Sequence, residues 1–238
     1  MVPSLTRSAR GNRDPDKRSP RVAKRLRGMY ETLHKALGPQ HWWPGETPEE
    51  VIVGAILTQN TAWVNVRQAI DNLKRANCLT LRALHDIDEG KLAKLIRPSG
   101  YFRLKAKRLK AAVRWIAENY DGDLGAMFAQ DPARLREELL GVYGLGPETV
   151  DSILLYAGGV TTFVVDTYTT RILRRHFLLD DAASYDETKE LFEANLPADA
   201  ALFNEYHALL VAVGKDYCKP KARCAQCPLR RWRHNPER

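Results

Sequence analysis

Two acidic residues, Glu148 and Asp166, stand where a carboxylate can take part in chemistry. Asp166 follows the apolar residues 163–165 and opens a stretch with helical periodicity, so the backbone fixes its position. A fixed carboxylate stabilises positive charge that develops on a reacting group, and it can orient a water molecule. The structural alternative is a helix N-cap. Glu148 also has a structural alternative, because an acid in a first turn interacts favourably with the helix dipole.

A glycine-rich turn precedes Glu148. In the segment VYGLGPETV, Gly144 and Gly146 flank Leu145, and glycine can adopt positive φ angles or allow a close backbone approach. The amides of such a turn, together with the open N-terminus of the following helix, can bind one phosphate group. This backbone site would carry no base readout. An ordinary corner between two helices is the alternative.

Three of the four cysteines lie near the C-terminus. Cys218, Cys224 and Cys227 are separated by five and then by two residues, among several Lys and Arg residues. In an intracellular protein this spacing favours a metal site over disulfides. We expect Cys78, in contrast, to be a small buried hydrophobe.

Basic residues are concentrated at both ends of a chain whose net charge is +8. Residues 1–27 carry nine Lys and Arg against two Asp, and residues 215–238 carry eight against two acids. Residues 91–114 contain nine basic residues and no acid. Because phosphate contacts release counterions, this distribution favours a polyanionic partner. Solubilising tails are the alternative for the ends.

Helical periodicity covers almost the whole chain, and strand-like alternation is nearly absent. We expect a flexible basic arm at 1–20. No apolar run approaches the roughly 20 residues that cross a bilayer, and no signal core is present, so we expect a soluble intracellular protein. Capping signals such as Thr47 before Pro48 set the boundaries. The sequence predicts an all-α fold with helices at 22–37, 48–58, 62–76, 80–85, 89–96, 102–119, 132–140, 147–157, 167–176, 185–195 and 199–214.

The glycine turn, followed by Asp166 in FVVDTYTTRIL, resembles the signature of the endonuclease III superfamily of helix-hairpin-helix DNA glycosylases. The resemblance covers most of 25–230. It implies two helical domains with a DNA cleft between them: a six-helix barrel at 48–155 that carries the hairpin, and a second domain formed by 21–47 and 156–238. In this family, the positions of Gln59 and Asn60 support the emptied base stack. The amides of Gly144, Leu145 and Gly146 would hold the DNA backbone.

The same resemblance implies that Asp166 assists cleavage of the N-glycosidic bond of a flipped-out damaged base. Bifunctional members carry a lysine just after the hairpin, and that lysine attacks the sugar to form a Schiff base. Glu148 occupies this position, and a carboxylate cannot form an imine. We therefore predict a monofunctional glycosylase that uses water.

The segment HWWPGETPEEVIVGAILTQNTAW is similar to bacterial 3-methyladenine glycosylases of endonuclease III type. The similarity implies a base pocket lined by Trp42, Trp43 and Pro44. An alkylated purine is electron-poor or cationic, so it stacks well on indole, and Glu148 could hydrogen-bond its edge. A plug of aromatic side chains between helices is the alternative.

Family members with an iron–sulfur cluster show the pattern Cys-x6-Cys-x2-Cys-x5-Cys. Here the first spacer is one residue shorter and Arg233 occupies the fourth position. A 4Fe-4S cluster held by Cys218, Cys224 and Cys227 is favoured, with the fourth ligand open and His234 as one option. Zinc bound by the same residues and a site without metal are the alternatives.

These observations predict a monomeric glycosylase of base excision repair that acts on alkylated purines. Its partner would be double-stranded DNA with a damaged base or an abasic site, in the cytoplasm at the nucleoid and not at a membrane. One alternative is a bifunctional glycosylase and AP lyase on oxidised pyrimidines, with another amine as nucleophile. The alternative of another class is a non-enzymatic binder of damaged or abasic DNA.

Overall fold

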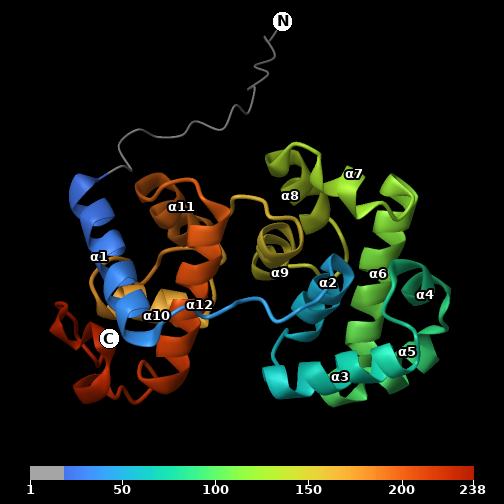
Figure 1. The fold of residues 1–238 in the computed structure, drawn as a ribbon, viewed down its shortest axis with the longest axis horizontal. Helices are drawn as coiled ribbons and strands as arrows, with labels where there is room; N and C mark the ends of the chain where they lie inside the picture. Colours follow the sequence, from blue (N-terminus) through green and yellow to red (C-terminus); the bar gives the residue numbers. More distant parts are fainter. Residues whose placement is uncertain (1–18) are drawn as a thin grey trace, which may run out of the picture.

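The computed structural model describes residues 19–238, and these residues form α-helices and short helical turns without a strand (Figure 1). The predicted all-α fold is confirmed. Most of the expected basic arm lies outside the described residues. The helices are α1 (Pro20–Leu37), α2 (Pro48–Leu57), α3 (Trp63–Arg75), α4 (Leu81–Asp86), α5 (Glu89–Leu95), α6 (Phe102–Tyr120), α7 (Leu124–Phe128), α8 (Pro132–Leu140), α9 (Pro147–Ser152), α10 (Thr167–Arg175), α11 (Tyr185–Asn195) and α12 (Ala200–Asp216).

Local capping explains where several helices begin. The hydroxyl of Thr47 accepts a hydrogen bond from the amide of Glu50 at 3.2 Å, and Pro48 opens α2. Asp131 caps α8 in the same way. These contacts satisfy backbone donors that a helix start leaves unpaired. Among residues 19–238, the sequence analysis missed the α-helix α7, which Asp123 caps, and the short 3-10 turns at 97–99, 224–226 and 228–231.

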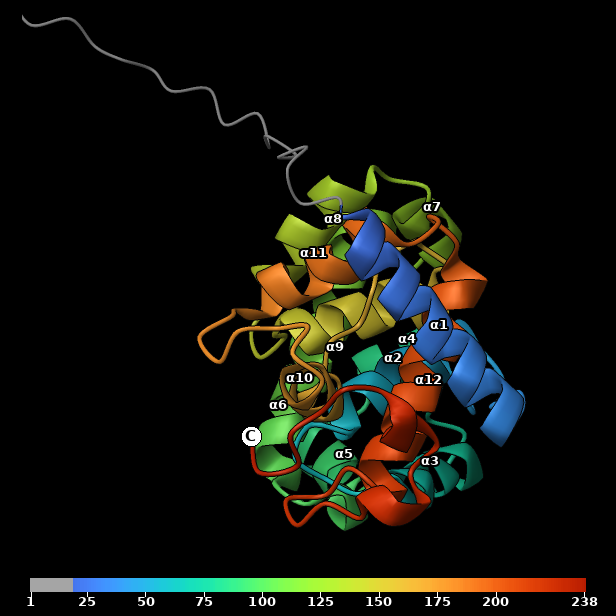
Figure 2. The same ribbon diagram turned by 90° about the vertical axis from the view of Figure 1, so that its left-hand side faces the viewer.

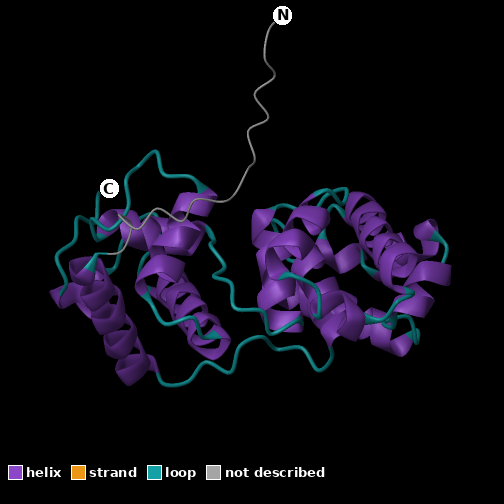
Figure 3. Cartoon of the chain, turned by 90° about the horizontal axis from the view of Figure 1, so that it is seen from above, coloured by secondary structure: helices purple, strands orange, loops and turns teal. Residues whose placement is uncertain are grey.

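The buried residues form two separate hydrophobic cores. The first core lies among helices α2 to α9, with Ile56 and Leu109 fully buried, and the second lies among α1, α10, α11 and α12 around Phe163 and Tyr206. We call the two groups of helices the first and the second lobe (Figure 1). The chain passes between them twice, before α2 and after α9 (Figure 3). Burial of apolar surface in each core stabilises the fold by roughly 25 cal/mol per Å² removed from water.

The helix predicted at 147–157 changes its geometry partway. After α9, residues Ile153–Ala157 form a π-helix. Leu154 belongs to the first core and Leu155 to the second, so this turn spans the two cores. A π-turn inside a helix rotates the side chains that follow it, and such turns are frequent at functional sites.

Helices α10 and α12 pack closely in the second lobe. A Cβ atom on Gly214 of α12 would lie 2.4 Å from the ring of Tyr168 on α10, so only glycine permits this approach. The chain after α12 folds back over the same lobe, as Figure 2 shows, and the amide of Asn235 donates to the carbonyl of Arg175 at 2.8 Å. The two helices thereby form a common scaffold for residues at both ends of α10.

Part of the basic stretch 91–114 serves the interior. The Nζ atom of Lys105, whose side chain is buried, donates to the carbonyls of Leu57 and Ser99 at 2.8 and 2.6 Å. Lys110 donates to carbonyls at the end of α4. These two cations therefore bind carbonyls at helix ends. No helix among residues 19–238 has the length and apolarity of a membrane span.

Candidate active site

The hairpin turn joins α8 to α9 and presents Glu148. Gly144 has a φ angle of 82°, in the left-handed region, and the Arg108 side chain lies 2.2 Å from where a Cβ atom would be. The amide of Leu145 donates to the carbonyl of Val142 at 3.1 Å, and its side chain is buried in the first core. The positive φ angle and the close approach of the Arg108 side chain therefore both require glycine at position 144.

The amides at the tip of the turn are available to a ligand. Among the described residues, those of Gly144 and Gly146 have no hydrogen-bond partner, whereas the amide of Leu145 is engaged within the turn. Gly146 is the N-cap residue of α9 without a capping side chain. The turn thus offers two of the three amides that the sequence analysis assigned to phosphate binding.

Gln59 is bound to the hairpin in this structure. Its Nε2 atom donates to the carbonyl of Gly144 at 3.0 Å and to the hydroxyl of Thr149 at 2.9 Å, and Arg108 donates to its Oε1 atom. Asn60 is exposed and has a φ angle of 52°. Insertion of Gln59 into a duplex would require the loss of these bonds, whereas Asn60 is already free to project outward.

Asp166 caps α10 and also faces a histidine. Its Oδ1 atom accepts a hydrogen bond from the amide of Thr169 at 2.7 Å, as the capping interpretation predicts. Its Oδ2 atom lies 3.8 Å from the Nε2 atom of His207, and the carboxylate retains only a small exposed surface. The position is therefore compatible with both interpretations of this residue.

Glu148 and Asp166 are close enough to influence one another. Burial and, secondly, the negative charge of Asp166 raise the pKa of Glu148 to about 7. Glu148 nevertheless keeps an exposed surface. Protein surrounds the Glu148 carboxyl on several sides, and solvent reaches it on another. This explains both its raised pKa and its exposed surface, and contact with solvent limits the rise of the pKa in the free protein. With a pKa of about 7, the Glu148 carboxyl is partly protonated at neutral pH.

Aromatic side chains gather beside the carboxylates. The Trp43 ring contacts Trp42 edge-on at 5.4 Å between centroids, Trp63 at 5.1 Å and the tilted ring of Tyr156 at 5.1 Å. The ammonium of Lys215 lies 5.7 Å above Trp42. The indole N–H group of Trp43 is buried and has no hydrogen-bond partner, whereas the Trp42 indole interacts with the hydroxyl of Tyr156. The unsatisfied donor of Trp43 favours a site that a polar ligand or water completes.

Pro44, the third residue expected in the base pocket, is exposed. The sequence analysis also missed two residues of this site, Tyr156 and His207. The phenol oxygen of Tyr156 lies 2.6 Å from the Nδ1 atom of His207, which α12 carries into the interior. His207 is one of several polar residues in α12, so the sequence carries no clear signal for this pair. The role of the pair depends on contacts between segments far apart in the chain.

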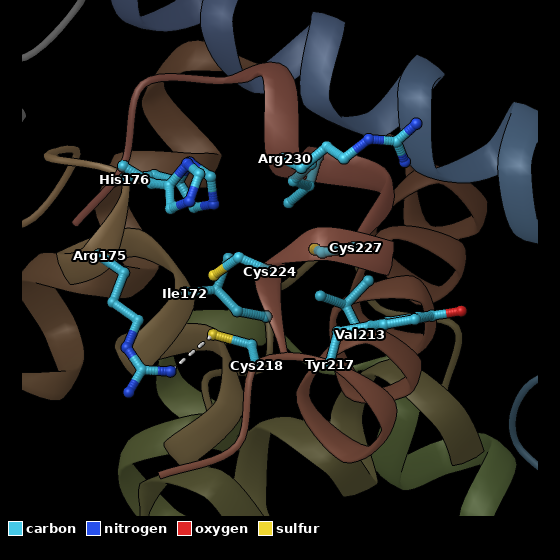
Figure 4. Close-up of a pocket in the computed structure, with 11 residues that line it drawn as sticks. Ile172, Arg175, His176, Val213, Tyr217, Cys218, Cys224, Cys227 and Arg230 are labelled. Atoms are coloured by element: carbon cyan, nitrogen blue, oxygen red, sulfur yellow. Dashed lines mark hydrogen bonds between the residues drawn. The ribbon is translucent and has the colours of Figure 1, made fainter. Parts of the chain in front are cut away.

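The three cysteines line one pocket at the other end of α10 (Figure 4). Arg175 donates to the Sγ atom of Cys218 at 3.3 Å, and His176 and His234 lie on the same pocket. Burial raises the pKa of Cys227. No carboxylate lines this pocket, so its donors are the soft and borderline ones that suit iron–sulfur clusters or zinc. Among residues 19–238, no three such donors are in an arrangement that would hold a metal ion.

Comparison with known proteins supplies a family and a set of relatives. The family model described as HhH-GPD superfamily base excision DNA repair protein matches residues 53–198. The chain is 49% identical over 203 residues to a Methanocaldococcus jannaschii protein provisionally named a DNA repair glycosylase, covering 85% of this chain and 92% of that one.

Two solved structures illustrate the likeness in three dimensions. The H. pylori 3-methyladenine DNA glycosylase bound to 1,N6-ethenoadenine is 30% identical, with a TM-score of 0.68 over 82% of this chain and 96% of that one. An endonuclease III–DNA complex has a TM-score of 0.77 at 20% identity, over 90% and 96% of the two chains, which supports the fold alone.

Proposed function

The chain belongs to the HhH-GPD superfamily of base excision DNA repair proteins, and we propose that this DNA glycosylase hydrolyses the N-glycosidic bond of alkylated purines without cleaving the strand. The observation that carries the proposal is Glu148 in the first turn after the hairpin. In the endonuclease III superfamily, which the sequence resembles, bifunctional members carry a lysine at this position. A carboxyl group cannot form the Schiff base from which strand cleavage proceeds.

Asp166 would assist bond cleavage. Loss of the base leaves positive charge on the sugar ring, and a carboxylate held on the α10 N-terminus stabilises that charge without reorganising. Water then adds at the sugar carbon and loses its proton, so the products are the free base and an abasic site. The hydrogen bond from the Thr169 amide, which holds Oδ1 of Asp166 in place, supports this assignment.

The aromatic cluster would receive the flipped base. Trp42 and Trp43 offer indole faces, Trp43 has an unsatisfied N–H donor, and Pro44 lies at the exposed rim. Glu148, protonated near neutral pH, would donate a hydrogen bond to an acceptor on the purine edge. The likeness to a glycosylase whose structure contains 1,N6-ethenoadenine supports a modified purine as substrate.

DNA would bind across the two lobes, which we propose to be the two domains implied by the sequence. The free amides of Gly144 and Gly146 would hold a backbone phosphate at the hairpin, and Leu145 would keep the turn in place. Asn60, with Gln59 behind it, would support the stack that the flipped base leaves. The damaged duplex is thus the partner, and the compartment is the one that holds the genome.

The cysteine pocket would hold a 4Fe-4S cluster, with Cys218, Cys224 and Cys227 as thiolate ligands. The fourth ligand would be His234. Its Nδ1 atom lies 2.7 Å from the carbonyl of Trp232, which can only accept, so Nδ1 carries the proton and Nε2 is free to ligate. Such a cluster would fix the basic C-terminal segment as a structural unit.

One observation favours the bifunctional alternative. Lys215 is an exposed amine beside Trp42, and it could attack the sugar in place of the missing lysine. The second alternative, a non-enzymatic binder, would keep the pocket and the hairpin without turnover.

A panel of duplexes tests these functions. Purified protein is incubated with duplexes that carry 3-methyladenine, 7-methylguanine, 1,N6-ethenoadenine, thymine glycol, uracil or an abasic site, with and without borohydride. Release of an alkylated purine, with strand breaks only after hot alkali, is expected. A borohydride-trapped adduct that Lys215→Ala abolishes would identify the bifunctional enzyme. Tight binding to abasic DNA with no release from any duplex would identify the binder.

The variant Glu148→Lys is a matched control, because it restores an amine at the same helix position. We expect this variant to form the borohydride-trapped adduct that the natural sequence does not form. An adduct formed by Glu148→Lys would show that the trapping conditions detect an imine at this site, so that its absence in the natural protein can be interpreted.

A further inference from the structure

His207 is a buried histidine for which the proposed chemistry has no role. It lies on α12, and its side chain is almost fully buried. Its Nε2 atom has no hydrogen-bond partner, and the carboxylate oxygen Oδ2 of Asp166 is 3.8 Å away. That separation is too long for a hydrogen bond, so the two side chains would have to move closer to pair. An orphaned N–H in the interior is unfavourable, which favours such a movement.

Tyr156 determines which ring nitrogen of His207 carries the proton. Its hydroxyl lies 2.6 Å from Nδ1, and burial raises the pKa of Tyr156 well above its usual value, so the phenol keeps its proton. When this hydroxyl donates to Nδ1, the proton of the neutral imidazole is on Nε2, the atom that faces Asp166. The reverse arrangement would place a lone pair against a carboxylate oxygen.

The surroundings keep the imidazole neutral. Burial lowers the pKa of His207, the Asp166 carboxylate opposes this shift, and the positive charge of Lys215 adds to it. The phenol of Tyr156 is the other titratable group in contact with the ring. A neutral ring with Nε2–H toward the carboxylate can orient Asp166 without neutralising it.

We propose that His207, with its tautomer set by Tyr156, is a positioning residue that holds the Oδ2 oxygen of Asp166 during base excision. This inference rests on the proposed function. The amide of Thr169 holds Oδ1, so a hydrogen bond from Nε2–H of His207 to Oδ2 would fix the plane of the carboxylate. Fixed orientation of a group that meets developing charge contributes directly to rate.

Substitutions at 207 separate this role from simple packing. In Gln the side-chain nitrogen reaches about as far as Nε2 of His, whereas in Asn it reaches only as far as Nδ1. We therefore expect His207→Gln to keep the single-turnover excision rate within about threefold, and His207→Asn and His207→Leu to lower it by roughly 10- to 100-fold. Tyr156→Phe, which keeps the ring against Trp43, should lower it by a smaller factor.

The measurement is single-turnover excision on the duplex the panel identifies, beginning with 1,N6-ethenoadenine, alongside affinity for a duplex with an abasic-site analogue. Affinity and melting temperature are expected to stay near those of the natural sequence in His207→Asn, so the loss is in the chemical step. Equal rates for Leu, Asn and Gln variants would overturn the positioning role, as would a loss that follows the melting temperature.

Asp166→Asn distinguishes failure of this inference from failure of the proposed function. If Asp166→Asn abolishes excision while His207→Leu excises at the natural rate, only the positioning role is wrong. If Asp166→Asn excises normally, the catalytic assignment of Asp166 is wrong, and the role of His207 falls with it.

Discussion

The two candidate sites lie at opposite ends of the same pair of helices. At the start of α10, Asp166 meets His207 of α12, and at the end of α10, Arg175 meets Cys218, which follows α12. The first site combines side chains from α9, the π-turn, α10 and α12. The second draws its sulfur donors from one short segment, residues 218–227. Under the proposed function, the first end would carry out the chemistry and the second would hold a loop.

Removal of the Asp166 charge should have the largest effect and act on the first site alone. We expect Asp166→Asn to lower single-turnover excision by about 100-fold or more, because a preorganised charge opposite the developing positive sugar is lost. Asn also caps helices well, so the melting temperature should change little. Calorimetry and gel-based excision assays measure both effects. A large drop in melting temperature would show that capping is the main role of this residue.

Glu148 should make excision depend on pH. Its raised pKa of about 7 means that the carboxyl holds its proton below that pH and loses it above. If the protonated form binds the base, the single-turnover rate falls as pH rises through about 7. Glu148→Gln, which stays neutral and keeps an N–H donor, should be active with a flatter profile. A falling profile that survives in Glu148→Gln would assign the titration to another group.

The same residue gives a stability test with a defined sign. The pKa of Glu148 is higher in the folded protein than the ordinary value of 4.5. The folded state therefore binds more protons between these values, so this group's contribution to stability is present below about 4.5 and is lost as pH rises to about 7. Denaturant titrations of the natural protein and Glu148→Gln should differ in this window.

Metal analysis tests the second site. We expect anaerobically purified protein to contain iron and sulfide, and a variant with the partly exposed Cys224 replaced, Cys224→Ser, to lose both. His234→Ala should weaken the cluster without changing excision chemistry per folded molecule. Zinc in place of iron would support the zinc alternative, and natural protein without either metal would show that the pocket binds none.

The sequence predicted local features better than it predicted the site. Helices with strong periodicity and caps, such as the one that begins at Pro48, follow from neighbouring residues alone. Tyr156 and His207 could not be assigned, because their roles depend on the π-turn and on the packing of α10 against α12. Lys105 was misleading for the same reason. Its charge suggested a DNA-facing residue, and the fold directs it to two carbonyls in the interior.

The smallest expected effect is at Arg175, and it tests most selectively whether the two ends of α10 have separate roles. Its guanidinium donates to the carbonyls of Lys219 and Pro220 at 2.7 and 2.9 Å, besides the Sγ atom of Cys218. Arg175→Gln should leave buried acceptors unpaired and lower the free energy of unfolding by about 1–3 kcal/mol. Excision per folded molecule should stay unchanged, because the acid site lies at the other end of α10. His207→Asn should show the opposite pattern, slow excision with little loss of stability, because the Asn amide can still pair with the Tyr156 hydroxyl. If Arg175→Gln also slows the chemical step, then the two ends of α10 are coupled, and the division between a chemical end and a holding end is wrong.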